Sequence, residues 1–257
     1  MLYCRPNPSL VDAPERPMPE IIEVELLCRD LRRWLDGRRV RLEAPDVGAE
    51  ALEQSVTAIR RRGKYALIEG QQTTWVLHLR MTGKVVPSRG GKARARFHTS
   101  EGVYDFEDTR RLGTLEATAR FDDAHLGPEP WPARRDGSWW RAQLRTRSAI
   151  KVALMRQDLV AGLGNIAASE ILFRARIHPW RPVPELRRWD ALAHHAHAYL
   201  DDLLAHEQGQ EIQYVNQGGP NPFRVYGKTA CPDCDGSLSV GTQSGRSTWH
   251  CPRCQPG

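Results

Sequence analysis

Four cysteines near the C-terminus constrain the fold more than any other feature of this 257-residue sequence. Cys231, Cys234, Cys251 and Cys254 form the pattern C-x2-C-x16-C-x2-C. Each C-x2-C pair can turn two thiolates toward one tetrahedral ion, and the stretch between the pairs can form one hairpin. Two disulfides are the alternative, which the lack of a signal-peptide-like stretch disfavours. The pattern therefore predicts a β-hairpin with one structural Zn²⁺, because four thiolates leave no open position for a substrate.

Composition sets broader limits. Lys and Arg number 37 against 31 Asp and Glu, a net charge of +6, and 40% of the residues are hydrophobic. This balance excludes disordered, collagen-like and coiled-coil chains and is compatible with a weak preference for an acidic partner. With no apolar run of membrane-spanning length, we expect a soluble cytoplasmic protein that makes no membrane contact.

The pattern of apolar residues divides the rest of the chain. Helical spacing over 20–35 is followed by Gly37, and short apolar runs between about 40 and 120 indicate strands. After the Pro-rich segment 127–132, four stretches have helical periodicity: 139–144, 150–154, 166–176 and 189–207. The expected fold is α+β and multidomain. Its parts are a leader (1–17), a β-sandwich domain with an N-terminal helix (18–130), a helix-two-turn-helix domain (131–222) and a zinc finger (223–257).

Seven segments in register resemble the formamidopyrimidine-DNA glycosylase and endonuclease VIII family of bacterial DNA glycosylases. The resemblance spans residues 18 to 255, and the zinc pattern is its most specific element. The other segments are Met18-Pro-Glu-Ile-Ile-Glu-Val-Glu25, Arg62-Gly-Lys-Tyr65, His78-Leu-Arg-Met-Thr-Gly83, Asp108-Thr-Arg-Arg-Leu-Gly113, Gly162-Leu-Gly-Asn-Ile166 and Val225-Tyr-Gly-Lys228. Members are bifunctional base-excision repair enzymes.

The resemblance assigns catalytic roles to four residues. Pro19 matches the N-terminal proline, a secondary amine that attacks C1′ of the sugar and forms an iminium, which acts as the electron sink for β,δ-elimination. Glu20 matches the acid/base that protonates the sugar ring oxygen, and Glu23 matches a second acid that orients the sugar. Lys64 matches a lysine that contacts the phosphate beside the lesion. It ends the run Arg60-Arg-Arg-Gly-Lys64, which suits a phosphate track, with a solvated basic turn as the alternative. Without the resemblance, Pro19 and Glu20 would be read as ordinary residues of a helix start.

The resemblance also assigns DNA contacts. Met81 and Arg110 match residues that fill the space left by the flipped base, and Leu112 stands where an aromatic residue is usual. Core packing alone would also account for Met81 and Leu112. Asn165 ends the glycine-rich turn Gly162-Leu-Gly-Asn165 at a helix start, a geometry that presents backbone N–H groups to an anion. Arg246 lies at the hairpin tip. The remaining matches are all to phosphate contacts, namely Lys151, Asn165, Tyr226, Lys228 and Arg246.

Two departures from the family pattern bear on function. The first is the segment 214–226, which resembles a lesion-capping loop but is shorter. Residue 167 is Ala where Tyr is usual, and we expect this change to affect packing. We expect excision of oxidised purines, namely 8-oxoguanine and formamidopyrimidines, from double-stranded DNA by a monomer. The alternatives are an oxidised-pyrimidine glycosylase of the endonuclease VIII type and a catalytically silent protein that binds damaged DNA. A zinc hydrolase is disfavoured because the ion is fully ligated.

The other departure is the position of Pro19, which follows 18 residues in this sequence. A proline within the chain has an amide nitrogen with no nucleophilic lone pair. We therefore expect the functional start to be Met18, with this Met removed because a small proline follows it.

Overall fold

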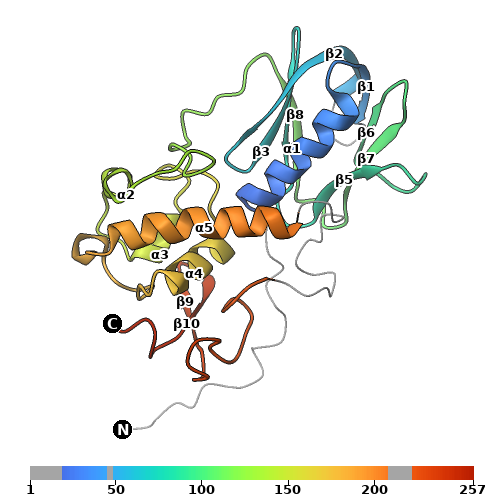
Figure 1. Cartoon of the computed structure of the whole chain (residues 1–257). Helices are drawn as coiled ribbons and strands as arrows, with labels where there is room; N and C mark the ends of the chain where they lie inside the picture. Colours follow the sequence, from blue (N-terminus) through green and yellow to red (C-terminus); the bar gives the residue numbers. More distant parts are fainter. Residues whose placement is uncertain (1–18, 45–48, 208–221) are drawn as a thin grey trace.

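The computed structural model describes residues 19–44, 49–207 and 222–257 (Figure 1). The expected leader, residues 1–17, and all but the last five residues of the expected capping loop 214–226 lie outside these ranges. None of the helices within them has the length and apolar character that a membrane span requires.

The first part of the chain consists of one helix and an eight-stranded antiparallel sheet. The helix is α1 (Ile21–Leu35), as the spacing predicted, and Gly37 takes the left-handed conformation just beyond its end, at φ +71°. The strands are β1 (Arg39–Ala44), β2 (Ala49–Arg62), β3 (Tyr65–Gly70), β4 (Thr74–His78), β5 (Gly83–Pro87), β6 (Ala95–His98), β7 (Val103–Asp108) and β8 (Thr114–Thr118).

The long strand β2 allows the sheet to fold over into a sandwich. The strand order is β5-β7-β6-β1-β2-β3-β4-β8, so β2 joins two groups of strands, and its pairing with β3 shifts register between Val56 and Ala58. Side chains of the two groups meet across the interior, where the rings of Trp75 and Phe97 lie 6.0 Å apart. The β-sandwich expected from the sequence is confirmed.

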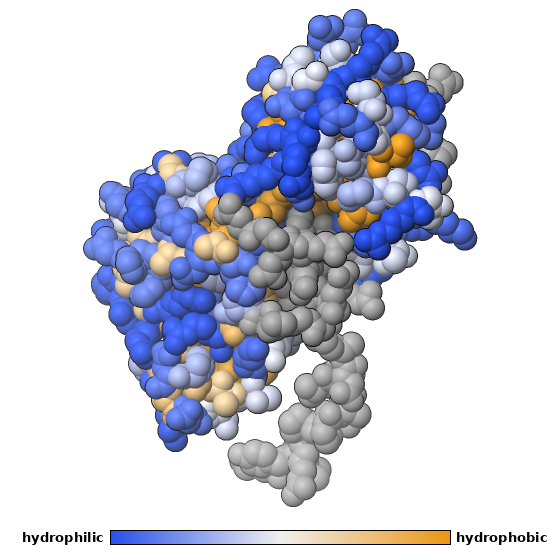
Figure 2. All heavy atoms as spheres, turned by 45° about the vertical axis from the view of Figure 1, so that its right-hand side comes forward, coloured by the Kyte–Doolittle hydropathy of each residue, from blue (hydrophilic) through white to orange (hydrophobic). Residues whose placement is uncertain are grey.

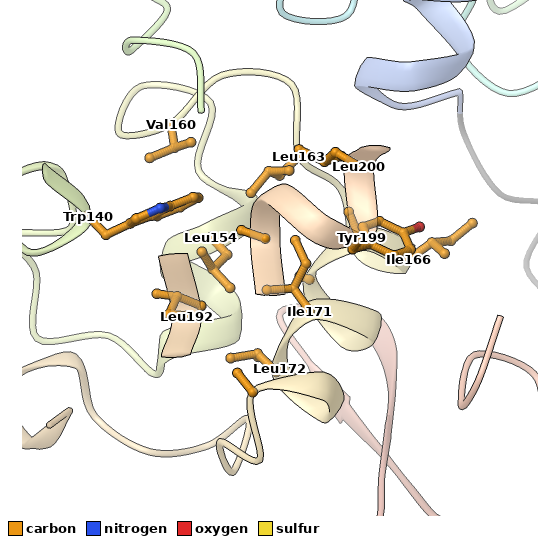
Figure 3. Packing of buried hydrophobic residues seen from close by; sticks show 14 of the residues in the cluster. Trp140, Leu154, Val160, Leu163, Ile166, Ile171, Leu172, Leu192, Tyr199 and Leu200 are labelled. Atoms are coloured by element: carbon orange, nitrogen blue, oxygen red, sulfur yellow. The ribbon is translucent and has the colours of Figure 1, made fainter. Parts of the chain in front are cut away.

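The second part is helical. Its elements are α2 (Gly137–Gln143), α3 (Ile150–Met155), α4 (Asn165–Arg174), the 3₁₀ helix η3 (Val183–Glu185) and α5 (Trp189–Glu207). These agree closely with the four predicted stretches. Figure 3 shows how α3, α4 and α5 contribute to one apolar core, with Leu154, Ile171 and Leu200 among its members.

Helix α1 belongs to both cores. Ile21, Ile22 and Leu26 pack with the helical part, whereas Val24, Leu27 and Leu31 pack with the sheet. In Figure 1 the N-terminal end of α1 lies beside the C-terminal end of α5. Figure 2 shows the two lobes, which have mostly hydrophilic surfaces, with hydrophobic residues gathered where they meet. The first turn of α1 is therefore held at the junction of the lobes.

The C-terminal hairpin rests on the helical part. Strands β9 (Ser239–Gln243) and β10 (Arg246–His250) are joined by Ser244 and Gly245, both with positive φ, as in a two-residue hairpin turn. The Gln243 side chain donates to the Pro179 carbonyl (3.3 Å), and the Trp180 ring packs against Gly241. These contacts fix the hairpin, and with it Arg246, relative to α4.

Candidate active site

The carboxylate of Glu20 joins the two lobes. Glu20 precedes the first residue of α1, and its side chain accepts the backbone N–H groups of Gly164 (3.0 Å), Ile166 (3.0 Å) and Ala167 (3.1 Å) at the start of α4. A helix N-terminus is an anion site because its first N–H groups lack partners and the helix dipole is positive there. The anion site expected at Gly162–Asn165 thus exists, but its backbone donors hold Glu20.

Gly164 makes this contact possible. A Cβ on Gly164 would lie 2.3 Å from Glu20 Oε1 and 2.7 Å from Lys64 Nζ. Nearby, the Ile21 N–H donates to the Gly162 carbonyl (3.1 Å). The glycine-rich turn therefore gives α1, and the Lys64 ammonium, room to approach the start of α4.

Glu23 lies one turn along α1 and is also buried. It accepts the backbone N–H of Glu20 (3.0 Å), which places its carboxyl group beside the Pro19–Glu20 peptide bond. Burial, with a contribution from the nearby Glu20 carboxylate, raises the pKa of Glu23 to about 7. Glu23 can therefore hold a proton near neutral pH, and the structure brings Pro19, Glu20 and Glu23 together.

Lys64 reaches the same place from the β2–β3 turn. The turn depends on Gly63, which has φ +56° and donates its N–H to Glu129 (2.5 Å). Burial lowers the pKa of Lys64; Glu20 acts against this shift and Arg246 adds to it. The Lys64 ammonium is thus partly dehydrated, and an incoming anion would interact with it more strongly than with a solvated lysine.

The three arginines that precede this turn do not extend a phosphate track. Arg60 pairs with Glu69, Arg61 binds Glu129 through two nitrogens (2.5 and 3.1 Å), and Arg62 binds Asp123 (2.7 Å). Arg62 also donates to the carbonyls of residues 126 and 127. Arg61 and Arg62, with side chains only 4% and 19% exposed, tie β2 to the segment that links the lobes. The alternative of a solvated basic turn holds only for Arg60, which is 62% exposed and pairs within the sheet.

A pocket of about 270 Å³ opens beside the glutamates. Lys64, Asn165 and Arg246, three of the predicted phosphate contacts, line it together. Its wall further comprises Tyr65, His78, Arg80, His125, Leu126, Met155, Gln157 and Gly164. Tyr65, His78 and Arg80 lie in matched segments, but their residue types alone predicted no role for them. The cationic side chains of Lys64, Arg80 and Arg246 make this pocket suitable for a phosphate group.

His78 is another titratable group in this wall. Burial lowers its pKa to about 4, with further contributions from Arg80 and Lys64, so the ring is neutral at physiological pH. Its Nδ1 accepts the backbone N–H of Arg80 (3.1 Å). The proton of the neutral ring is therefore on Nε2, which leaves a hydrogen-bond donor on the other side of the ring.

The contacts of Lys151 differ from the phosphate contact that the resemblance implied. Its side chain is fully buried and donates to Asn165 Oδ1 (2.6 Å), Thr248 Oγ1 (2.7 Å) and the Ser247 carbonyl (3.1 Å). A direct contact with phosphate would require it to leave these acceptors. The position of Lys151 is that of a link between α3, α4 and the hairpin.

The three expected base-space residues lie on two adjoining turns. Met81 is in the turn between β4 and β5, and Arg110 and the 43% exposed Leu112 are between β7 and β8. The buried Asp108 connects the turns, because it accepts the Thr82 hydroxyl and the N–H groups of Arg110 (3.3 Å) and Gly113 (2.6 Å). The turns that carry the three residues therefore adjoin.

Tyr226 and Lys228 follow a segment anchored to α4. The buried carboxylate of Glu170 accepts the backbone N–H groups of Arg224, Val225 and Tyr226, each at 2.9 Å. The Tyr226 ring is buried against Trp249 at 4.4 Å, and Lys228 is half-buried. Neither residue lines the pocket described above. Glu170 is therefore a structural anchor, which its place within a helical stretch did not predict.

The four hairpin cysteines form the predicted cluster. Their Sγ atoms all lie within 4.8 Å of one another, with 3.8 Å between Cys231 and Cys254 and 3.6 Å between Cys234 and Cys251. Tetrahedral Zn–S bonds of about 2.3 Å would place the sulfurs roughly 3.8 Å apart, whereas a disulfide requires about 2.05 Å. All four are free thiols in the structure, so the cluster fits one metal ion and not two disulfides.

Buried carboxylates beside a basic pocket are suited to chemistry on a phosphodiester backbone, and known proteins identify the family. Residues 18–115 match the formamidopyrimidine-DNA glycosylase N-terminal domain, and residues 126–212 match the H2TH domain of the same enzymes. Because these matches cover more than half of the chain, it belongs to the formamidopyrimidine-DNA glycosylase family. It is thus a DNA glycosylase, the enzyme class that the motifs predicted.

Individual relatives agree. The formamidopyrimidine-DNA glycosylases of Pelobacter propionicus and Novosphingobium aromaticivorans are 35% and 36% identical, each over 93% of this chain and 100% of its own length. The structure of Lactococcus lactis Fpg with abasic-site DNA has a TM-score of 0.80 at 28% identity, covering 93% of this chain and 100% of that one. For the MutM (Fpg) protein of Thermus thermophilus the TM-score is 0.79 at 30% identity, with 92% and 98% covered.

Gly164→Ala tests the junction. Because the added Cβ would overlap the Glu20 carboxylate, we expect base excision to slow by on the order of 100-fold. Single-turnover excision from an oligonucleotide measures this effect. Gly91→Ala is the control, since a Cβ there meets no atom within 4 Å and should leave the rate unchanged. A Gly164→Ala rate equal to that of Gly91→Ala would contradict the described contact.

The raised pKa of Glu23 has a consequence for stability. The folded state holds the Glu23 proton more tightly than the unfolded state, so its contribution is full below about pH 4.5 and is lost as pH rises through about 7. Glu23→Gln cannot titrate, and its stability relative to wild type should improve by roughly 2–3 kcal/mol between pH 4.5 and 8. Urea unfolding at both pH values measures this, with exposed Glu116→Gln as control. An equal difference at both pH values would refute the shift.

Proposed function

We propose that this chain is a bifunctional DNA glycosylase and abasic-site lyase that excises oxidised purines, 8-oxoguanine and formamidopyrimidines, from double-stranded DNA. One observation carries the proposal: the junction of the lobes brings Pro19, Glu20, Glu23 and Lys64 together beside a pocket that Asn165 and Arg246 also line. The named relatives are formamidopyrimidine-DNA glycosylases, which supports the choice of substrate.

The proposed nucleophile is the secondary amine of Pro19. A terminal α-amino group titrates near ~7.7–8.0, so part of it is unprotonated at neutral pH. The amine attacks C1′ of the damaged nucleotide, the bond from C1′ to the base breaks, and the amine loses its proton. Protonation of the ring oxygen O4′ then breaks the C1′–O4′ bond, and the ring-opened product is an iminium with no N–H to lose. Its positive charge draws electrons from C2′, and β- and then δ-elimination expel the flanking phosphates. This chemistry requires a free amino group on Pro19, so the experiments below use protein that begins at Pro19.

The glutamates fit complementary roles in this reaction. The Glu20 carboxylate is oriented by three N–H donors beside Pro19, where it can act on the sugar ring oxygen and stabilise the iminium cation. Glu23, with a pKa of about 7, can exchange a proton close to the Pro19–Glu20 peptide bond and orient the sugar.

DNA would be held by two sets of groups. The pocket of Lys64, Asn165 and Arg246 would take the phosphates beside the lesion, with Tyr226 and Lys228 as further contacts along the backbone. Met81, Arg110 and Leu112, on their adjoining turns, would fill the space of the extruded base. Leu112 offers less stacking surface than an aromatic residue, so we expect it to fill this space without stacking strongly on the neighbouring bases.

We propose Zn²⁺ as the ion of the cysteine cluster, because four thiolates at these separations suit tetrahedral zinc. Cys231, Cys234, Cys251 and Cys254 would hold it, and its contribution would be to the folding of the hairpin that carries Arg246.

Borohydride trapping tests the proposed function. Protein that begins at Pro19 should become covalently attached to an abasic-site duplex when borohydride is present, because reduction fixes the iminium. Protein that retains residues 1–18 should not be trapped, since its Pro19 nitrogen is an amide. If the protein with a verified Pro19 terminus is not trapped, the lyase is refuted in favour of a silent DNA-binding protein.

Cys234→Ser tests the role of the metal. Loss of one thiolate should lower zinc content and, by loosening the hairpin that carries Arg246, weaken DNA binding and lesion excision by about tenfold or more. Metal analysis and binding to duplex DNA provide the measurements. Cys28→Ser is the matched control because Cys28 is a buried thiol outside the cluster, and its zinc content should stay at one ion. Unchanged activity of Cys234→Ser would argue against a role for the finger.

A further inference from the structure

We infer that Lys151 is a positioning residue, which orients the Asn165 amide and seats the hairpin so that Asn165 and Arg246 together form the phosphate pocket. The inference rests on the proposed binding of DNA phosphate in that pocket. It replaces the direct phosphate contact that the resemblance implied for Lys151.

The first step of the argument is the geometry of the ammonium group. Lysine has three N–H donors, and Lys151 Nζ has three acceptors from two different parts of the fold. Asn165 belongs to the first turn of α4, whereas Ser247 and Thr248 belong to β10, directly after Arg246. One buried charge therefore sets the distance between the two elements that supply the pocket residues.

The second step concerns the Asn165 amide. An ammonium group only donates, so the atom that faces Lys151 at 2.6 Å must be the amide oxygen. Its Nδ2 is then a donor on the other side of the amide, and among the described residues it has no hydrogen-bond partner. A buried donor without an acceptor is costly, so a phosphate oxygen bound in the adjoining pocket would be stabilised by it. Lys151 thus determines which amide atom is available to DNA.

The third step concerns the hairpin. Thr248 is fully buried and its hydroxyl can also donate to Gln243 (3.4 Å), whose side chain holds the Pro179 carbonyl. Lys151 is therefore part of the interface on which the hairpin rests. Without the ammonium group, this interface would lose its bonds to β10, and Arg246 at the start of that strand would lose its fixed position.

The salt dependence of DNA binding distinguishes positioning from direct contact. Each lost phosphate contact lowers the slope of log K against log salt by about 0.9. Binding to a duplex with an uncleavable abasic analogue is measured across KCl concentrations for wild type, Lys151→Met and Lys64→Met. We expect Lys64→Met to lose about 0.9 from the slope, and Lys151→Met to lose about tenfold in affinity at every salt concentration with less than about half that change in slope. Lys84→Met is the control, because Lys84 pairs with Glu107 on the sheet.

Two further measurements exclude a general folding defect. The affinity loss of the Lys151→Met, Asn165→Ala double variant should be smaller than the sum of the single losses, because both act through one amide. In wild type the side-chain amide signal of Asn165 in a ¹H–¹⁵N spectrum should shift on addition of inorganic phosphate, and in Lys151→Met it should not. Should Lys151→Met not fold, Thr248→Val, which removes one acceptor, carries the same expectations with smaller losses.

The inference is overturned if Lys151→Met, or Thr248→Val in its place, binds DNA as tightly as wild type. It is overturned equally if Lys151→Met loses as much slope as Lys64→Met, or if the double variant is additive. If wild-type protein does not bind the duplex, the proposed function fails first.

Discussion

The hydrogen bonds between the Glu20 carboxylate and the start of α4 are the interaction on which the rest of this structure depends. They join a residue at the first turn of α1 to three backbone amides more than 140 positions away in the chain. The same carboxylate is the proposed acid/base, so domain assembly and catalytic geometry have one cause. Gly164, the burial of Ile21 and Ile22 in the helical core, and the bond from Ile21 to Gly162 all serve this contact.

Burial at this junction controls the charges of the site. Glu23 is shifted toward its protonated form, while Lys64 and His78 are shifted toward their neutral forms, and in each case burial is the largest cause. Burial also excludes water, which strengthens the interaction between the cations of the pocket and an incoming phosphate. The site therefore combines a proton-holding acid, an oriented carboxylate and a poorly hydrated cation within one small region.

Sequence patterns were sufficient for features whose physics is local. The cysteine spacing predicted the metal cluster, and the apolar periodicity predicted α1 and the four main helices almost to the residue. The sequence did not predict the ends of the long strand β2, because its charged outward-facing residues obscure the alternation of apolar and polar positions. Family resemblance brought Glu20, Glu23 and Lys64 to one site correctly, since those motifs retain their order and spacing.

The sequence could not predict which groups from distant segments of the chain pair with one another. The glycine turn before Asn165 correctly indicated an anion site, but only the fold shows that its backbone amides bind Glu20. The arginine run 60–62 suggested free cations, whereas carboxylates from elsewhere in the chain pair with them. Lys151 has the residue type of a phosphate contact, yet its depth and its three acceptors are set by the packing of the hairpin on α4.

The most direct test of this account is a crystal structure of the protein that begins at Pro19, reduced onto an abasic-site duplex with borohydride. We expect a covalent bond between the Pro19 nitrogen and C1′, with Glu20 still bound to the first turn of α4. A phosphate oxygen should lie within hydrogen-bonding distance of Lys64 Nζ and Asn165 Nδ2. A bond from C1′ to Lys64 instead, or phosphates that bypass this pocket, would contradict the account.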